Sequence, residues 1–193
     1  MKIISLTPSG TEIIASLDLI ENLVGRSHEC NFPKEVERKV KVTSSKMQND
    51  FTLREIDDFV RDAKKSGLDI YEINKEIIAD VQPDYILTQG LCDVCAISDT
   101  QVERTLTDLK EGLRSEPQVV SLSGYLLKDI MNDIRRLGKV FDREEKAEKL
   151  IQEAKINMSN LTEKPNISKS VLLLEWVDPF YGPGHWIPEQ IKL

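Results

Sequence analysis

Short runs of apolar and β-branched residues alternate along this chain with segments whose apolar residues recur every three to four positions. The clearest runs are 2–6, 23–25, 85–88 and 119–122. A period of two indicates a strand, and a period near 3.6 indicates a helix. Strands that alternate with helices are typical of crossover units and of a largely parallel sheet. The sequence therefore predicts an α/β fold.

Three S/T-x-x-E/Q sequences mark predicted helix starts. They are Ser9-Gly10-Thr11-Glu12, Thr52-Leu53-Arg54-Glu55 and Ser98-Asp99-Thr100-Gln101. In such a capping box, each of the two side chains accepts a hydrogen bond from a backbone amide that the helix leaves free. We expect a helix to begin at each of these sequences.

Two apolar stripes after residue 122 predict two consecutive helices, and the second of these is long and heavily charged. It ends before Pro165, because the residue that precedes a proline disfavours helical geometry. The apolar run Ser170–Glu175 then predicts a buried strand. We predict a parallel-sheet N-terminal α/β lobe over residues 1–142, a connecting backbone helix over 143–164, and the beginning of a truncated C-terminal α/β lobe over 165–193.

Charge and hydropathy exclude several classes of function. Charged residues make up 31% of the chain with a net charge of −7, and the two signs are interspersed, so no basic stripe predicts a nucleic-acid partner. No run approaches the roughly 20 apolar residues that span a bilayer, so no membrane insertion is expected. The run 3–6 is too short for a signal peptide, which predicts a cytoplasmic chain. No nucleophile elbow or phosphate loop indicates an enzyme.

The rarest residue types are concentrated in three loops. Both histidines, both tryptophans and all three cysteines lie in 26–33, 89–98 and 176–189, together with Phe32, Phe180 and Tyr181. Each loop follows a predicted strand, and open parallel sheets bind ligands beyond the carboxyl ends of their strands. We therefore expect a binding crevice at this edge.

Cys92 and Cys95 have the C-x-x-C spacing of a metal or redox pair. On an extended segment His28 and Cys30 would point the same way, so the four residues would form a Cys₃His set suited to zinc or iron. Taken singly, Cys30 is better read as a small buried filler and His28 as a hydrogen-bonded histidine. Asp99 would disfavour a thiolate nearby. The set supports an alternative hypothesis of a cytoplasmic metalloprotein or thiol redox protein.

The C-terminal segment 174–189 is rich in aromatic residues around the turn Gly182-Pro183-Gly184. Tryptophan buries a large area and also donates a hydrogen bond, which suits a flat, amphipathic ligand. The structural alternative is an aromatic loop that packs on its own sheet.

Five ordered segments together carry a family resemblance. They are 4–12, 24–33, 83–89, 176–179 and 184–189. With sequences such as Arg26-Ser27-His28-Glu29-Cys30-Asn31-Phe32-Pro33, they resemble the cobalamin-binding proteins of the iron-siderophore and vitamin B12 periplasmic-binding superfamily. The resemblance implies two α/β lobes joined by a long helix, a ligand in the cleft between them, and delivery to an ABC transporter permease.

Carried over by position, the resemblance implies a set of residues that contact a corrinoid. The set is Pro8, Ser9, His28, Glu29, Cys30, Phe32, Gln89, Trp176, Tyr181, His185 and Trp186. A corrinoid has a broad apolar ring, an amide fringe and a cobalt centre, so aromatic faces, polar groups and an imidazole suit it. Because members of the superfamily extend further, we expect a truncated copy. A second hypothesis is a domain that pairs through the strand 171–175 with a separately encoded lobe.

Overall fold

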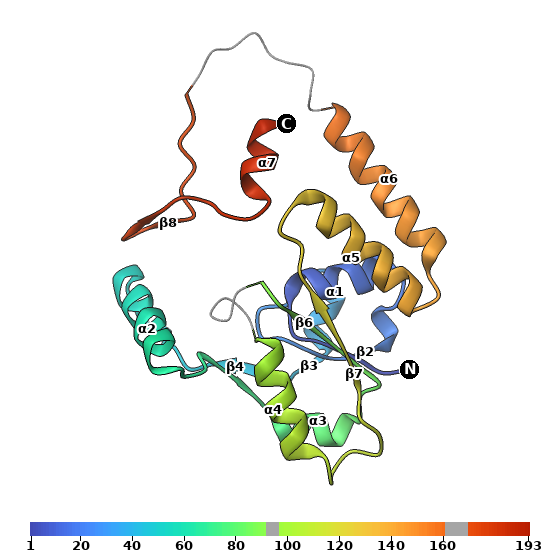
Figure 1. The fold of residues 1–193 in the computed structure, drawn as a ribbon. Coiled ribbons are helices and arrows are strands. Elements are labelled where there is room, and N and C mark those ends of the chain that lie inside the picture. The colour runs from blue at the N-terminus through green and yellow to red at the C-terminus, as the bar shows by residue number, and fades with distance from the viewer. Residues whose placement is uncertain (92–96, 161–169) are drawn as a thin grey trace. The chain divides into compact units, whose positions relative to one another are not determined.

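The computed structural model describes residues 1–91, 97–160 and 170–193. Its main feature is a five-stranded sheet in the order β3-β2-β1-β6-β7, in which all neighbouring strands are parallel (Figure 1). The strands are β1 (Ile3–Ser5), β2 (Leu23–Arg26), β3 (Val40–Lys41), β6 (Tyr85–Gln89) and β7 (Gln118–Leu122). The predicted α/β class is confirmed.

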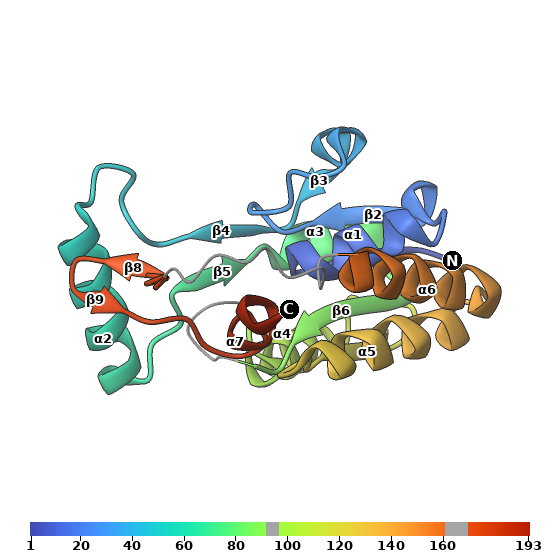
Figure 2. The same ribbon diagram turned by 90° about the horizontal axis from the view of Figure 1, so that it is seen from above.

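Helices and two small antiparallel sheets complete the described residues. The helices are α1 (Pro8–Ser16), α2 (Leu53–Ser66), α3 (Lys75–Val81), α4 (Asp99–Leu109), α5 (Leu127–Val140), α6 (Glu144–Asn160) and α7 (Ile187–Lys192), with 3₁₀ turns at Ile20–Asn22 and Lys34–Arg38. β4 (Thr43–Ser45) pairs with β5 (Tyr71–Ile73), and β8 (Trp176–Val177) pairs with β9 (Phe180–Tyr181) (Figure 2).

The order of the strands places a switch point at β1. Helix α1 leads from β1 to β2 on one side, and β6 pairs with β1 on the other side, with Ile3 opposite both Leu23 and Tyr85. The chain then continues outward through α4 to β7. In open α/β sheets the loops at such a reversal diverge and leave room for a ligand.

Apolar strands covered on both faces form the centre of the core. Ile3 and Ile4 of β1 are completely buried, which is why the run reads as continuously hydrophobic rather than alternating. One cluster joins β1, β6, α3 and α4 with the segment between β3 and β4. Its buried members are Ile4, Leu6, Val42, Ile73, Ile78, Ile86, Ile97, Val102 and Leu106.

The chain divides into two compact units. The first comprises residues 1–51 and 58–123, and the second comprises 52–57 and 124–193. The first turn of α2 therefore belongs to the second unit. The partition into a lobe, a connecting helix and a second lobe stays a prediction.

The capping boxes have different outcomes. Glu55 accepts hydrogen bonds from the amide and hydroxyl of Thr52, each at 2.7 Å, as predicted. The Ser98 hydroxyl accepts a hydrogen bond from the backbone amide of Gln101 at 3.2 Å and caps α4. The Gln101 side chain does not complete the capping box, because it donates to the carbonyl of Tyr71 instead.

The predicted cap at Ser9 is wrong. Helix α1 begins at Pro8 after Thr7, so Ser9 lies inside the first turn. Proline suits the first helical position because its missing amide would have no partner there. The Ser9 hydroxyl instead lies 3.1 Å from the hydroxyl of Thr7.

The predicted buried strand at 170–175 is also wrong. These residues form no strand, and Val171 and Leu172 are 77% and 82% exposed. A strand forms when its backbone groups pair with a neighbour, and residues 170–174 have no such neighbour among the described residues; only the Glu175 amide pairs, with the Tyr181 carbonyl at 2.9 Å. An apolar pattern alone therefore did not produce a strand.

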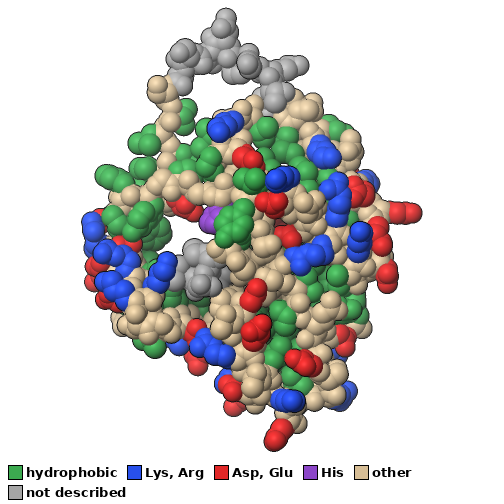
Figure 3. Space-filling view, in the orientation of Figure 1, with side chains coloured by type: hydrophobic (Ala, Val, Ile, Leu, Met, Phe, Trp, Pro, Cys, Tyr) green, Lys and Arg blue, Asp and Glu red, His purple; other side chains and the backbone are tan. Residues whose placement is uncertain are grey.

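None of the described helices is long and apolar enough to cross a membrane. Acidic and basic side chains are interspersed on the face shown in Figure 3. This distribution agrees with the mixed charge pattern read from the sequence.

Candidate functional site

Polar side chains meet at the switch point between β1 and β6. The Thr7 hydroxyl donates to Gln89 Oε1 at 3.2 Å and lies 3.1 Å from the Ser9 hydroxyl. Because Thr7 has one hydroxyl proton, Ser9 is the donor in the second contact. The Gln89 amide nitrogen, which carries two protons, has no partner among the described residues. The hydrogen bonds that connect Ser9, Thr7 and Gln89 therefore leave the NH₂ group of Gln89 as a donor at the carboxyl edge of the sheet, with no partner in the described part of the chain.

His28 lies beyond the carboxyl end of β2 and is held by Thr43. The Thr43 hydroxyl lies 2.7 Å from His28 Nδ1 and accepts from the His28 amide at 3.0 Å. The imidazole also packs against Tyr71, with the ring centroids 5.4 Å apart. Both contacts come from β4 and β5, so the small antiparallel sheet fixes the orientation of the ring.

The other imidazole nitrogen, Nε2, is buried and has no hydrogen-bond partner within the described residues. Glu29 Oε1 lies 3.3 Å away without hydrogen-bond geometry. His28 lines a cavity of about 30 Å³ together with Leu6, Pro8, Ser27, Glu29, Tyr71 and Ile97. Buried polar atoms are nearly always paired, so an unpaired one at this edge indicates a place for a ligand atom.

Burial lowers the pKa of His28 below its ordinary value of 6.5, Glu29 raises it in part, and Lys41 lowers it further. The unfolded chain therefore takes up this proton at a higher pH than the folded chain does. We expect stability to fall as the pH drops through about 6.5, and His28→Gln to flatten that dependence. Urea unfolding between pH 5 and 8 measures it. His185→Gln, at the only other histidine of the chain, is the matched control, and a change of slope confined to His28→Gln assigns the effect to His28.

Cys30 faces the core. Its thiol is completely buried and accepts a hydrogen bond from the Thr11 hydroxyl at 3.0 Å. Burial raises the pKa of this thiol, and the hydrogen bond from Thr11 partly opposes that rise. Residues 28 and 29 form a turn, closed by the Cys30 amide on the Ser27 carbonyl, so the extended geometry assumed for His28 and Cys30 is wrong.

Only His28 and Cys30 of the four residues in the predicted metal set belong to the described part of the chain. Cys92 and Cys95 lie outside the described residues, so the four-residue site stays a prediction. Within the described ranges, no three histidine, cysteine or acidic side chains are grouped so that they could hold a metal ion.

Four other predicted residues lie on the surface of this edge. Pro8 and Ser9 are exposed in the first turn of α1, and Glu29 and Phe32 are exposed in the loop after β2. The Phe32 side chain is 63% exposed, which is unusual for a large aromatic residue. A contact between these residues and a ligand stays a prediction.

The remaining predicted residues belong to the second unit. The β8–β9 hairpin is fixed to the first turn of α2, since the Tyr181 hydroxyl donates to Asp57 Oδ1 at 2.7 Å and Arg54 binds Asp178 at 2.5 Å. Trp176 Nε1 donates to the Asp178 carbonyl. The tyrosine hydroxyl is therefore engaged within its own unit.

His185 is the centre of an aromatic group in the same unit. Its ring centroid lies 5.3 Å from that of Tyr125 and 5.9 Å from that of Trp186, and its backbone is left-handed, with φ of 54°. The structure thus brings His185 and Trp186 together, and it places His28 and Gln89 at the sheet edge of the first unit.

Sequence reasoning missed two residues of this edge. Thr43 orients His28, and Asp99 has a buried carboxylate oxygen, Oδ1, without a partner among the described residues. Thr43 lies on a strand too short to give a periodic signal. Asp99 was noted only at a helix start and as a charge that disfavours a nearby thiolate, not as a residue of the site.

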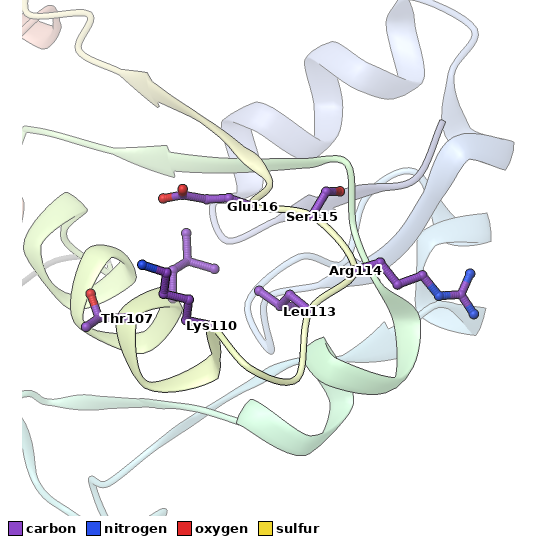
Figure 4. A pocket seen from close by; sticks show the side chains of 7 residues that line it. Thr107, Lys110, Leu113, Arg114, Ser115 and Glu116 are labelled. Atoms are coloured by element: carbon purple, nitrogen blue, oxygen red, sulfur yellow. The ribbon is translucent and has the colours of Figure 1, made fainter.

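A larger pocket lies at the opposite end of the sheet. It has a volume of about 360 Å³ and is lined by Leu106, Thr107, Lys110, Leu113, Arg114, Ser115 and Glu116, directly before β7 (Figure 4). The Arg114 side chain points away from Lys110 and Glu116. This pocket is at the amino ends of the strands, where ligand sites of open sheets are not expected.

Comparison with known proteins identifies the fold. A family model described as "Periplasmic binding protein" matches residues 3–167. A possible iron-binding (periplasmic solute-binding) protein from Staphylococcus epidermidis is 24% identical with a TM-score of 0.63, covering 94% of this chain and 59% of its own. The periplasmic vitamin B12 binding protein of Vibrio cholerae is 18% identical with a TM-score of 0.63, and the match covers 98% of this chain and 62% of that protein.

A periplasmic haem binding protein, also of Vibrio cholerae, is 17% identical with a TM-score of 0.60, covering 90% of this chain and 54% of its own. The chain thus spans 54–62% of the length of these three structures. No curated protein matches the sequence.

Proposed function

We propose a binding function on the premise that this chain belongs to the periplasmic binding protein family, whose model matches residues 3–167. The chain binds a corrinoid at the carboxyl edge of its parallel sheet, without catalysis, as a component of ABC-transporter type. Its partners are the corrinoid and a transporter permease. The family is periplasmic by its description, so the predicted cytoplasmic location is not supported.

One observation carries the location of the site. His28 Nε2 is buried and has no hydrogen-bond partner among the described residues, on a ring that Thr43 and Tyr71 hold in place at the end of β2. A fixed imidazole nitrogen without a partner is suited to a ligand atom, either as a hydrogen-bond partner or as a donor to cobalt. The switch point beside it supplies Thr7, Ser9 and Gln89.

The choice of a corrinoid rests on the sequence motifs and on the chemistry of this edge. The compared structures include proteins described as binding iron, vitamin B12 and haem. The chain supplies neutral polar groups at the switch point, and aromatic groups at Trp176, Tyr181, His185 and Trp186. Neutral donors suit amides, and flat aromatic faces suit a macrocycle. Buried Cys30 supports the loop from the core side rather than contacting the ligand.

Titration with cyanocobalamin, haemin and ferric chloride tests this proposal. Both tryptophans of the chain are among the residues that the sequence motifs assign to ligand contact, so we expect a bound corrinoid to quench their fluorescence in a saturable way. We expect saturation by cyanocobalamin with a weaker response to haemin. Saturation by haemin or iron alone, or by none of the three, would overturn the corrinoid assignment.

Three variants locate the site. His28→Gln should weaken cyanocobalamin binding several-fold, because one hydrogen bond or ligand bond contributes about 1 kcal/mol or more. Trp176→Phe and Trp186→Phe show which tryptophan reports the ligand. Lys110→Gln in the pocket before β7 is the matched control and should bind as the parent chain does.

A further inference from the structure

The geometry points to Tyr125 as a further residue of the ligand site, one that presents its ring to the apolar face of the macrocycle beside His185 and Trp186. This inference rests on the proposed function and deepens it. Tyr125 lies in none of the sequence segments that carry the family resemblance, so its role is inferred from the structure.

Tyr125 lies in the loop that directly follows β7, three positions after the last residue of that strand, Leu122. The Gly90 amide donates to the Leu122 carbonyl at 2.9 Å, so the loops after β6 and β7 begin side by side. Open α/β sheets bind their ligands at loops of this kind, beyond the carboxyl ends of parallel strands. The place of Tyr125 in the chain therefore favours a ligand contact.

Tyr125, His185 and Trp186 form an aromatic row within the second unit. The ring centroid of His185 lies 5.3 Å from that of Tyr125 and 5.9 Å from that of Trp186, with interplanar angles of 41° and 40°. Aromatic rings attract one another at these spacings. A broad ring system that lies over such a row gains many small dispersion contacts, and these add up.

The aromatic row keeps exposed surface that a ligand can cover. Tyr125 is 52% exposed although it contacts His185. His185 is also exposed, and Trp186 is half-buried. Because the removal of apolar surface from water is favourable, a macrocycle that covers these rings is stabilised there.

Two hydrogen bonds fix the start of α5, directly after Tyr125. The Leu127 amide donates to Glu189 Oε2 at 2.7 Å, which ties the first turn of α7 to the first turn of α5. The Leu126 amide donates to Asp129 Oδ2 at 2.9 Å. Since α7 begins directly after the other two rings, these bonds hold both ends of the row. The row is therefore formed before a ligand arrives, which lowers the cost of binding.

The backbone of the central ring also supports a binding role. His185 has a left-handed backbone with φ of 54°. Residues other than glycine seldom adopt this conformation, and those that do are concentrated at ligand sites. A backbone of this kind at the centre of an exposed aromatic row is what a ligand site would contain.

Cyanocobalamin titration of variants at position 125 tests the ring. Tyr125→Leu should weaken binding about two- to tenfold, as the loss of one aromatic contact implies, whereas Tyr125→Phe keeps the ring and should bind as the parent does. Phe51→Leu is the matched control, because it removes a ring from the separate Phe51–Phe59 pair, whose centroids are 5.9 Å apart. No loss in Tyr125→Leu, or an equal loss in Tyr125→Phe, would overturn the inference.

Fluorine NMR separates a ring contact from a structural effect of the substitution. The chain has four tyrosines, so Tyr125→Phe and Tyr85→Phe assign two of the lines of a chain labelled with 3-fluorotyrosine. Cob(II)alamin carries an unpaired electron that broadens nearby resonances, whereas cyanocobalamin is diamagnetic. Under anaerobic conditions we expect cob(II)alamin to broaden the Tyr125 line far more than the Tyr85 line, because Tyr85 is the first residue of β6, at the amino end of the sheet.

The outcomes keep this inference apart from the proposed function. Saturable cobalamin binding without preferential broadening of the Tyr125 line would refute the inference and leave the proposed function standing. A parent chain that binds no cobalamin would refute both. Thermal unfolding shows whether each variant is folded, and the fluorine measurement decides the inference even if Tyr125→Leu is not.

Discussion

Replacing Arg26 with methionine is expected to lower the free energy of unfolding by about 3 to 5 kcal/mol. Arg26 is only 5% exposed, and its guanidinium donates to the carbonyls of Ser27, Cys30, Glu37 and Lys39 at 2.7–3.3 Å. Methionine keeps the apolar stem but removes the donor from the carbonyls of Cys30, Glu37 and Lys39, whereas the Ser27 carbonyl keeps the hydrogen bond from the Cys30 amide. Hydrogen bonds to a charged group are each worth about 1.5–3 kcal/mol, so their combined loss is large.

Urea unfolding at neutral pH measures this effect. Arg26→Lys should lower the free energy of unfolding less than Arg26→Met does, because an ammonium keeps the charge. It should still be less stable than the parent chain, because an ammonium cannot reach all four carbonyls. Arg38→Met, at an exposed position of the same loop, is the matched control and should change stability by no more than about 0.5 kcal/mol. Equal effects at positions 26 and 38 would show that the buried guanidinium does not hold the loop.

The Arg26 contacts also connect stability to the site. The four carbonyls belong to the segment 27–39, which carries His28 and Phe32. This segment has little regular structure, so its backbone groups need partners from elsewhere. A single buried side chain supplies them. The loop that presents His28 is therefore shaped from inside the first unit.

The sheet and its helices could be predicted from the sequence because their signals are local. The strands 2–6, 85–88 and 119–122 and the capped helix starts at Thr52 and Ser98 need only a few neighbouring residues to be recognised. The loops that follow these strands were predicted as a crevice for the same reason. His28 and Gln89 do lie at the carboxyl edge of the described sheet.

The parts that could not be predicted depend on partners distant in sequence. Thr43 holds His28 from 15 positions away, and Asp99 stands out only because its buried Oδ1 has no partner among the described residues. The run 170–175 has a strand pattern, but a strand also needs a neighbour to pair with. The Ser9 motif failed because the helix starts at Pro8 with Thr7 as its N-cap, two positions before the predicted cap.

Replacing Gly138 with alanine is expected to destabilise the second unit by about 2 kcal/mol, within the range known for overpacked cores. Helices α5 and α6 contact each other directly, and both lie in this unit (Figure 2). A methyl group on Gly138 would lie 2.6 Å from the Cβ of Ala147, which is 1% exposed. The helices must therefore separate, and this cost exceeds the gain of roughly 1 kcal/mol from replacing glycine inside a helix.

Transferring the methyl group from one helix to the other tests this explanation. Ala147→Gly alone should also destabilise, through lower helix propensity and a small cavity. In the double variant Gly138→Ala with Ala147→Gly, the loss in free energy of unfolding should be smaller than the sum of the two single losses by about 1 kcal/mol. The new methyl group on residue 138 then fills the space that the Ala147 methyl group leaves. Gly112→Ala, where the nearest atom is 3.5 Å away, is the glycine-to-alanine control. Strict additivity in urea unfolding would mean that the two positions do not touch and that the close approach of α5 and α6 has another cause.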